Sequence, residues 1–309
     1  MGLIFSSSPR FNPRNDIPGL SGKVIFVTGG NTGLGKETIL QLAKHNPERI
    51  YLGARSEAKA KAAIGDIKET VPTANIIFLQ LDLASLKSVK KAAETLLSET
   101  DRLDILVNNA GVMLANSGLT EDGYEINFGT NYMGPVLLTK LLLPLLERTA
   151  TAGKDVRIIN VSSELYKAAP KRGILFEENK TPLADLGTLS RYGQSKLANA
   201  YYTKILAEKY PAIKSAALHP GLVRTNIAEE SKGSSIFMSL LLKVSEMAIA
   251  VDVETGALNQ LWASTSNEVQ TGEYYLPVGK AASNGLLKNR SLALKLWEWT
   301  EAELKTYIS

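Results

Sequence analysis

Residues 24–35 read VIFVTGGNTGLG, an apolar run that passes directly into a turn with four glycines. Glycine has no Cβ, so the backbone turns tightly and lets a pyrophosphate approach it closely. A helix that starts at Gly33 would aim its free N–H groups and the positive end of its dipole at that anion. The spacing through Gly29, Gly33 and Gly35 is G-x-x-x-G-x-G, not the common G-x-G-x-x-G. The alternative is a plain tight turn without a ligand. The position of these glycines between a strand and a helix nevertheless predicts dinucleotide binding.

Short apolar runs alternate with amphipathic stretches along most of the chain. The predicted strands are residues 24–27, 50–53, 76–81, 104–107, 156–161, 215–218 and 274–276. The predicted helices include residues 33–45, 57–69, 85–99, 128–148 and 192–210. Strands joined through helices form right-handed crossovers and a parallel sheet covered on both faces. We predict an α/β fold, with a lead of residues 1–20 and one Rossmann-type, doubly wound domain of residues 21–309 around a seven-stranded, mostly parallel sheet.

Composition limits the chemistry that this chain can perform. Of its 309 residues, 44% are hydrophobic and 21% are charged, which suits a globular core and excludes wholesale disorder. The absence of cysteine excludes disulfides, thiolate metal sites and a cysteine nucleophile. The only histidines are His45 and His219, so we expect no bound metal. The chemistry must use hydroxyls, carboxylates, lysines or a borrowed cofactor.

Charge and hydropathy bear on the partners and the location of the protein. The net charge is +4 and the two signs alternate along the chain, so we expect no nucleic-acid partner. No apolar run reaches the ~18 residues that a membrane helix needs. The N-terminal sequence MGLIFSSSPR fits the myristoylation template through Gly2 and Ser6, and a plain apolar tail is the alternative. We expect a cytoplasmic protein, which would contact membranes peripherally and reversibly if Gly2 is lipidated.

The end of the second predicted strand bears on the choice of cofactor. The dinucleotide fold places an acid near this point to bind a ribose hydroxyl, or an arginine to bind a 2′-phosphate. This chain has Arg55, followed by Lys59, and no acidic residue at the strand tip. A guanidinium binds a phosphate through two hydrogen bonds, so we favour NADP(H) over NAD(H). A solvated surface arginine is the alternative.

A tyrosine and a lysine lie four residues apart, in Tyr192-Gly193-Gln194-Ser195-Lys196, and so share one face of a predicted helix. A phenol titrates near ~10 in water, and a nearby ammonium favours the phenolate and brings this acid/base closer to working pH. Ser162 and Ser163 follow the strand at 156–161, at the sheet edge where open α/β folds bind ligands. Such a Tyr–Lys pair also arises by chance, but together these residues predict hydroxyl-based acid/base chemistry.

Seven motifs in this order resemble the short-chain dehydrogenase/reductase family, over most of the chain. They are residues 28–35, Asp82, residues 108–111 (NNAG), Asn131, Ser162-Ser163, residues 192–196 and residues 220–225 (PGLVRT). The turn N-T-G-L-G-K-E, the A-R-S after the second strand and the Y-x-Q-S-K-L-A-N pattern look like the retinol-dehydrogenase and WW-oxidoreductase branch. The resemblance implies an oxidoreductase that interconverts a carbonyl compound and its alcohol by hydride transfer.

The resemblance also implies a role for each matching residue. Tyr192 would exchange a proton with the substrate oxygen, Lys196 would lower the pKa of Tyr192 and hold the nicotinamide ribose, and Ser163, rather than Ser162, would bind the carbonyl. Asn131 would fix the water of a proton relay through Lys196. The implied cofactor contacts, besides Tyr192 and Lys196, are Gly29, Asn31, Thr32, Gly33, Leu34, Gly35, Arg55, Asp82, Leu83, Asn109, Ala110, Gly111, Pro220, Gly221, Val223 and Thr225. The hydride belongs to the cofactor, and the protein supplies position and proton.

Two segments bear on the substrate. Twenty-eight residues lie between Ser163 and Tyr192, more than in shorter family members, and we predict that residues 167–189 form a loop excursion, whose effect on substrate access the sequence leaves open. Residues 226–250 carry apolar side chains at helical spacing, as in a lid over the site or a helix that closes the core. A lid would indicate a bulky lipophilic ketone, aldehyde or alcohol as the small-molecule substrate.

Two further expectations concern the whole protein. A catalytically silent NADP(H)-binding sensor or scaffold is the alternative function, and the intact set of Ser163, Tyr192, Lys196 and Asn131 argues against it. Members of the family often associate through the helices that carry Asn131 and Tyr192. The resemblance therefore brings the expectation of a homodimer, which the sequence itself does not decide.

Overall fold

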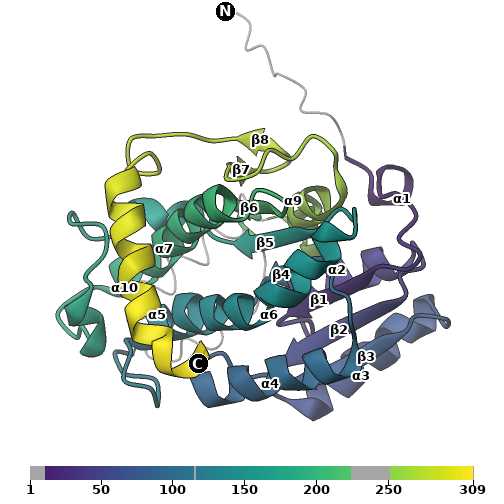
Figure 1. Cartoon of the computed structure of the whole chain (residues 1–309), viewed down its shortest axis with the longest axis horizontal. Helices are drawn as coiled ribbons and strands as arrows, with labels where there is room; N and C mark the ends of the chain where they lie inside the picture. The colour runs from purple at the N-terminus through teal and green to yellow at the C-terminus, as the bar shows by residue number, and fades with distance from the viewer. Residues whose placement is uncertain (1–10, 115, 224–250, 309) are drawn as a thin grey trace, which may run out of the picture.

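A single twisted sheet runs through the molecule (Figure 1). The computed structural model describes residues 11–114, 116–223 and 251–308. Its strands are β1 (Val24–Thr28), β2 (Arg49–Ala54), β3 (Ile76–Gln80), β4 (Ile105–Asn108), β5 (Arg157–Val161), β6 (Lys214–Leu218), β7 (Tyr274–Leu276) and β8 (Lys280–Ala281). They lie in the order β3-β2-β1-β4-β5-β6-β7-β8, parallel except for the β7–β8 pair. The predicted α/β fold is confirmed, with a short eighth strand added.

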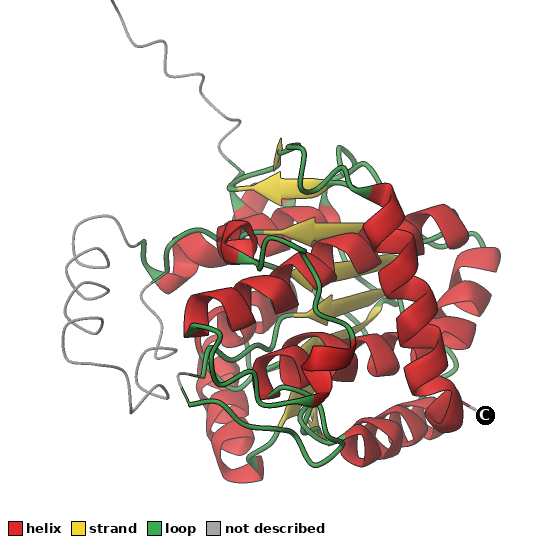
Figure 2. Ribbon diagram, turned by 90° about the vertical axis from the view of Figure 1, so that its left-hand side faces the viewer, coloured by secondary structure: helices red, strands yellow, loops and turns green. Residues whose placement is uncertain are grey.

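Helices cover both faces of this sheet (Figure 2). One apolar core lies against α4 (Leu86–Glu99), α6 (Gly134–Thr151), α7 (Thr188–Lys209) and α10 (Arg290–Ile308). The other lies against α2 (Gly33–Ala43), α3 (Glu57–Thr70) and α9 (Val253–Thr265). In β1, Phe26 belongs to the first core and its neighbours Ile25 and Val27 to the second. Because both faces are covered, the central strands are apolar throughout instead of alternating.

One predicted helix, residues 128–148, contains a π-helical turn in the structure. It is present as α5 (Ile126–Phe128), a π-helical turn (Gly129–Met133) and α6, which follow one another without a gap, so the predicted helix exists and contains a π-helical turn. Pro135 lacks an N–H and therefore leaves the Asn131 carbonyl without its donor four residues on. Wider π-helical turns of this kind recur at functional sites. Here the turn carries Asn131.

Two regions contain short helical turns besides the predicted elements. The N-terminal lead includes α1 (Pro13–Asp16), and the following Ile17 and Leu20 are buried in the second core. The segment before α7 contains two 3₁₀ turns, Glu164–Ala168 and Glu177–Lys180, and α7 begins at Thr188, four residues before its predicted start.

Some expectations fall where the structure gives no description. The predicted lipidation site at Gly2, the cofactor contact at Thr225 and the lid at 226–250 all lie outside the described residues. Within the described residues, no helix has both the length and the apolar character needed to cross a membrane.

Candidate active site

The glycine turn between β1 and α2 leaves no room for side chains. Gly29 and Gly33 have φ values of +66° and +50°, in the left-handed region that favours glycine. A Cβ on Gly35 would lie 2.2 Å from the Gly29 carbonyl oxygen, and one on Gly30 would lie 2.4 Å from Ile39 Cδ1. The backbone therefore packs tightly here and leads into the N-terminus of α2, where N–H groups lack helical partners. Asn31, Thr32 and Leu34, which complete this turn, keep part of their surface exposed.

Side chains from distant parts of the chain hold this turn. Asn109 Nδ2 donates to the Thr28 carbonyl at 2.9 Å, and the Ala110 N–H donates to Thr28 Oγ1 at 3.0 Å. Gln260 Nε2, on α9, donates to the Leu34 carbonyl at 3.2 Å. Sequence reasoning missed Gln260, because no local pattern links it to a turn more than two hundred residues earlier.

The polar residues after β2 and β3 lie farther along the same edge of the sheet. Arg55 is exposed directly after β2, and its carbonyl accepts from Gln80 Nε2 at 2.9 Å. Asp82 Oδ1 accepts from the Ala84 N–H at 3.0 Å, which orders the turn after β3. Leu83 is buried, and a Cβ on Gly134 would lie 2.3 Å from its carbonyl oxygen.

Ser163, Tyr192 and Lys196 come together at the carboxyl end of β5. The Ser163 side chain lies close enough to the Tyr192 hydroxyl for hydrogen bonding to act on the pKa of Tyr192. Lys196 Nζ lies 5.5 Å from the centroid of the Tyr192 ring and donates to the Val161 carbonyl at 2.9 Å. Ser162 points elsewhere, because its Oγ donates to the Lys196 carbonyl at 2.7 Å. Of the two adjacent serines, Ser163 is therefore the one beside Tyr192.

Burial shifts the two titratable groups of this cluster in opposite directions. It raises the pKa of Tyr192 to about 12, although the hydrogen bond from Ser163 acts the other way. It lowers the pKa of Lys196 to about 8, because a buried ammonium loses its hydration. At neutral pH Tyr192 is a protonated phenol and Lys196 is an ammonium. A neutral phenol suits proton donation to a substrate oxygen.

Asn131 reaches the cluster from the π-helical turn. Its Oδ1 accepts from the Val112 N–H at 2.7 Å, and its Nδ2 donates to the Val112 carbonyl at 2.8 Å and to Ser195 Oγ at 3.1 Å. The side chain thus fastens the segment after β4 to α7. A Cβ on Gly111 would lie 3.1 Å from Lys196 Nζ and 3.4 Å from Asn131 Oδ1, so Gly111 borders the same space.

The residues after β6 close the far side of the site. His219 is buried, its carbonyl accepts from Asn259 Nδ2 at 2.7 Å, and burial lowers the pKa of its imidazole. Pro220 follows, and Gly221 has a φ of +98°. Val223 pairs with Val251, and both the Val223 and Leu34 side chains lie against Gly256. Val223 and Val251 thus lie close to the glycine turn.

The predicted residues therefore form two groups on one edge of the sheet. The first group lies at the ends of β1, β4, β5 and β6. It surrounds the point between β1 and β4 where the strand order reverses, which is where open α/β sheets bind ligands. Arg55, Asp82 and Leu83 lie at the ends of the outer strands β2 and β3.

Known proteins resemble this chain along nearly its whole length. Residues 23–176 match the family described as short chain dehydrogenase. The short-chain dehydrogenase/reductase drtF of Aspergillus calidoustus is 39% identical, over 94% of this chain and 96% of its own. Retinol dehydrogenase 14 of Mus musculus is 34% identical, over 97% of this chain and 93% of its own.

Solved structures share the fold. An uncharacterized protein of Mycobacterium paratuberculosis superposes with a TM-score of 0.74 at 26% identity, covering 96% of this chain and 97% of that one. A 3-ketoacyl-(acyl-carrier-protein) reductase of Brucella melitensis complexed with NADH (TM-score 0.63, 24% identity) covers 84% of this chain and 98% of its own. A short chain dehydrogenase of Escherichia coli CFT073 complexed with NADPH (TM-score 0.62, 19% identity) has the same coverage.

Proposed function

The chain belongs to the short-chain dehydrogenase/reductase family of oxidoreductases, and we propose that it is an NADP(H)-dependent enzyme that interconverts a lipophilic ketone or aldehyde and its alcohol. One observation carries this proposal: the Tyr192 ring lies beside the Lys196 ammonium, and the Ser163 side chain is close enough to the Tyr192 hydroxyl to act on its pKa. A silent sensor or scaffold would have no use for a proton donor assembled in this way.

The residues present fit a dinucleotide. The tightly packed turn at Gly29 and Gly35, followed by the N-terminus of α2, offers N–H groups to a pyrophosphate with no Cβ in the way. Arg55 would bind the 2′-phosphate of NADP(H), and Asp82 would lie toward the adenine. Asn109, Gly111 and the residues from Pro220 to Thr225 would line the nicotinamide end. The bound cofactor supplies the hydride.

The protein's own groups move the proton. In carbonyl reduction the neutral Tyr192 phenol donates its proton to the substrate oxygen, which Ser163 holds by a hydrogen bond. The Lys196 ammonium then stabilises the phenolate that Tyr192 becomes. Asn131 has a positioning role, because its side chain is hydrogen-bonded to Val112 and Ser195. Its backbone carbonyl lacks the usual helical donor four residues on, because residue 135 is a proline without an N–H.

The substrate side is proposed to be lipophilic. Leu165, two residues after Ser163, and Leu222, directly after Gly221, are large apolar side chains that stay exposed, at 37% and 52%. Apolar groups that border a site favour an apolar substrate by removing its surface from water.

A turnover assay with lipophilic aldehydes and ketones tests the function. We expect the wild type to oxidise NADPH in their presence and Tyr192→Phe to lose about 10²–10⁴-fold in kcat while it still binds NADPH, because the phenylalanine has no proton to donate. Tyr202→Phe is the matched control, since its hydroxyl on the same helix has no hydrogen-bond partner among the described residues. If wild type and Tyr192→Phe both bind NADPH and neither turns over, the protein is the silent binder.

The same preparations test the cofactor choice. The dissociation constants of NADPH and NADH are compared in wild type, Arg55→Ala and the nearby control Lys61→Ala. We expect Arg55→Ala to weaken NADPH by about tenfold or more and to leave NADH unchanged, because only NADPH carries the phosphate. An NADH preference in the wild type would overturn this assignment.

A further inference from the structure

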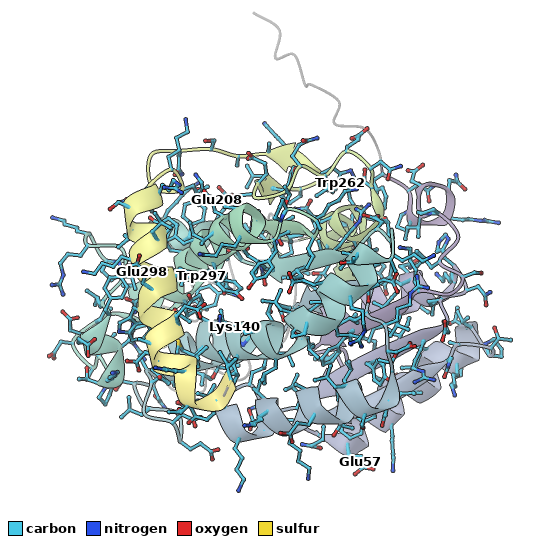
Figure 3. The ribbon with its side chains drawn as sticks, viewed as in Figure 1. Glu57, Lys140, Glu208, Trp262, Trp297 and Glu298 are labelled. Carbon is cyan, nitrogen blue, oxygen red and sulfur yellow. The ribbon has the colours of Figure 1, made fainter. Side chains whose placement is uncertain are left out.

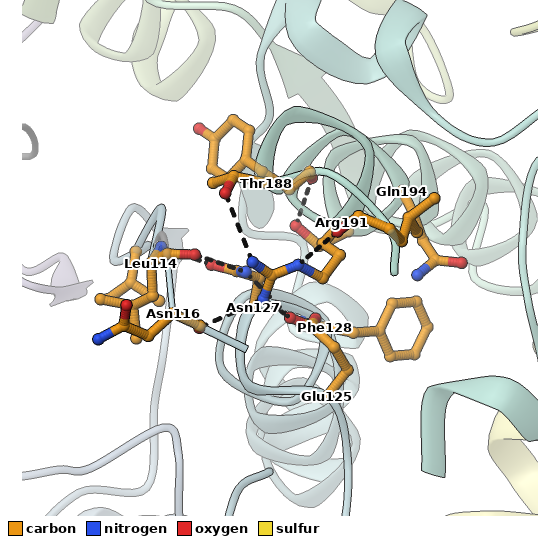
Figure 4. Close-up of polar contacts among 12 residues, drawn as sticks. Leu114, Asn116, Glu125, Asn127, Phe128, Thr188, Arg191 and Gln194 are labelled. Atoms are coloured by element: carbon orange, nitrogen blue, oxygen red, sulfur yellow. Dashed lines mark hydrogen bonds and ion pairs between the residues drawn. The ribbon is translucent and has the colours of Figure 1, made fainter. Parts of the chain in front are cut away.

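An ion pair without a part in the proposed chemistry lies beside Tyr192. Arg191 Nη1 and Glu125 Oε1 are 3.2 Å apart, and their side chains are 3% and 0% exposed (Figure 4). Burying both charges carries a desolvation cost, and well-packed apolar residues often replace such pairs without loss of stability. The pair therefore calls for an explanation other than stability.

Arg191 ties the start of α7 to the segments around it. Its Nη1 donates to the Asn116 carbonyl at 3.3 Å, and its Nε donates to the Leu186 carbonyl at 3.1 Å. Its Nη2 donates to Thr188 Oγ1 at 3.4 Å. These contacts reach the segment after β4 and the end of the insertion at 167–189. The next residue of α7 is Tyr192.

Glu125 does the same for the π-helical turn. Its Oε2 accepts from the Phe128 N–H at 2.8 Å and so caps α5, which continues into the turn that carries Asn131. Its Oε1 accepts from Asn127 Nδ2 at 3.0 Å, and Asn127 Oδ1 accepts from the Leu114 N–H at 2.8 Å. The Glu125 N–H donates to the Asn179 carbonyl of the insertion at 2.7 Å.

The insertion is also bonded directly to α7. Gln194 Oε1 accepts from the Leu175 N–H at 2.7 Å, and Gln194 Nε2 donates to Asn179 Oδ1 at 2.7 Å. All four segments thus meet at one buried pair: the start of α7, the π-helical turn, the chain after β4 at Leu114 and Asn116, and the insertion 167–189.

We propose that the Glu125–Arg191 pair is a positioning device that holds Tyr192 in register with Asn131 and couples the insertion to the active site. The inference rests on the proposed role of Tyr192 as proton donor. Both residues act through others, and neither is placed against substrate or cofactor.

Three variants separate positioning from plain stability: Glu125→Gln, Arg191→Met and the double variant. Each single change leaves a buried charge without its partner, so we expect a lower unfolding midpoint. The double variant removes both charges, and we expect its unfolding midpoint to recover most of the way to the wild-type value. Its kcat should stay about tenfold to a hundredfold below wild type with the NADPH dissociation constant unchanged, because a misplaced proton donor slows chemistry and not cofactor binding.

The matched control is Glu208→Gln with Arg290→Met, a pair 2.8 Å apart at the other end of α7 and largely exposed. Glu208 is labelled in Figure 3. We expect this double variant to keep both midpoint and kcat. If the Glu125→Gln/Arg191→Met variant regains kcat together with its midpoint, the pair is only structural and the inference is overturned.

Hydrogen exchange gives a readout that needs no turnover. In the double variant, peptides that cover residues 109–116 and 126–134 should exchange faster than in wild type, while peptides from β1 and β2 stay the same. If the wild type turns over no carbonyl, the proposed function fails on its own. The exchange measurement then still decides whether the pair orders these segments, and unchanged exchange rules against it.

Discussion

Two neighbouring serines at the end of β5 have the same chemistry and different surroundings. The Ser163 side chain lies beside the Tyr192 hydroxyl and acts on its pKa, whereas the Ser162 hydroxyl donates to the Lys196 carbonyl. We expect Ser163→Ala to lower kcat by about tenfold to a hundredfold with little change in stability, as the loss of one charge-stabilising hydrogen bond does. Ser162→Ala should instead lower the free energy of unfolding by about 1 kcal/mol. Steady-state kinetics and urea unfolding on both variants check this contrast, and the reverse pattern would exchange the two roles.

The pKa values of Tyr192 and Lys196 predict how carbonyl reduction depends on pH. Tyr192, at about 12, stays protonated throughout the usable range, so it sets no limit there. Lys196, at about 8, is charged below that pH and neutral above it. The rate of reduction should therefore be level from pH 6 to near 8 and fall as the pH rises through 8, because the phenolate then lacks its counterion.

The pH profile of kcat/KM for the carbonyl measures this fall. Lys196→Met is the control, and its low activity should no longer decline near pH 8. A wild-type rate that keeps rising through pH 9 would show that Lys196 holds its charge and that another group limits the reaction.

At the scale of single residues, the sequence indicated the groups whose chemistry is specific and missed those that act through distant partners. Ser163, Tyr192 and Lys196 were predicted because a hydroxyl at a strand end and a Tyr–Lys pair at helical spacing are local signals. Glu125 and Arg191 lie 66 positions apart, and each looks like an ordinary surface charge until the fold buries both. Distance along the chain hides such pairs from any local pattern.

Two glycines in neighbouring helices show how an element depends on its packing. Gly35, in α2, has no room for a Cβ because of the Gly29 carbonyl, whereas a Cβ on Gly65, exposed in α3, would meet nothing within 4 Å. We expect Gly35→Ala to cost about 1–3 kcal/mol of stability and to weaken NADPH binding, since the turn must shift. Gly65→Ala should stabilise by about 0.5–1 kcal/mol through helix propensity alone. Thermal unfolding and cofactor titration check both, and equal effects would contradict the close packing of the turn.

The predicted elements show where periodicity is a sufficient guide. All seven predicted strands are present within about one residue at each end, because buried parallel strands are continuous apolar runs bounded by polar residues. The helix at 128–148 was read as continuous because its apolar spacing persists through Pro135, yet the chain inserts a π-helical turn there. The two-residue strand β8 carries too few residues for any period to appear.

The packing of the whole molecule bears on its association. Helix α10 crosses over part of α6 and α7, the helices expected to carry a homodimer interface (Figures 1 and 3). Trp297 of α10 stacks on Tyr202 at 5.3 Å, and Thr300 Oγ1 is 2.9 Å from the Tyr132 hydroxyl oxygen. Residues 193–203 of α7 are all buried within this one chain. A dimer through the part of α7 around Tyr202 would first have to displace α10.

We therefore expect light scattering to give the mass of one chain across the micromolar range. The packing of α10 against α7 is tested by Trp297→Ala, which removes a buried indole and should lower the free energy of unfolding by about 3–5 kcal/mol. Glu298→Ala, one residue on and exposed, should stay within about 0.5 kcal/mol of wild type. If loosening α10 in Trp297→Ala also produces concentration-dependent dimers, the helix occupies a surface that would otherwise associate. A wild-type dimer whose contacts protect α7 from hydrogen exchange would contradict this account, because that surface would then have to be open in the intact protein.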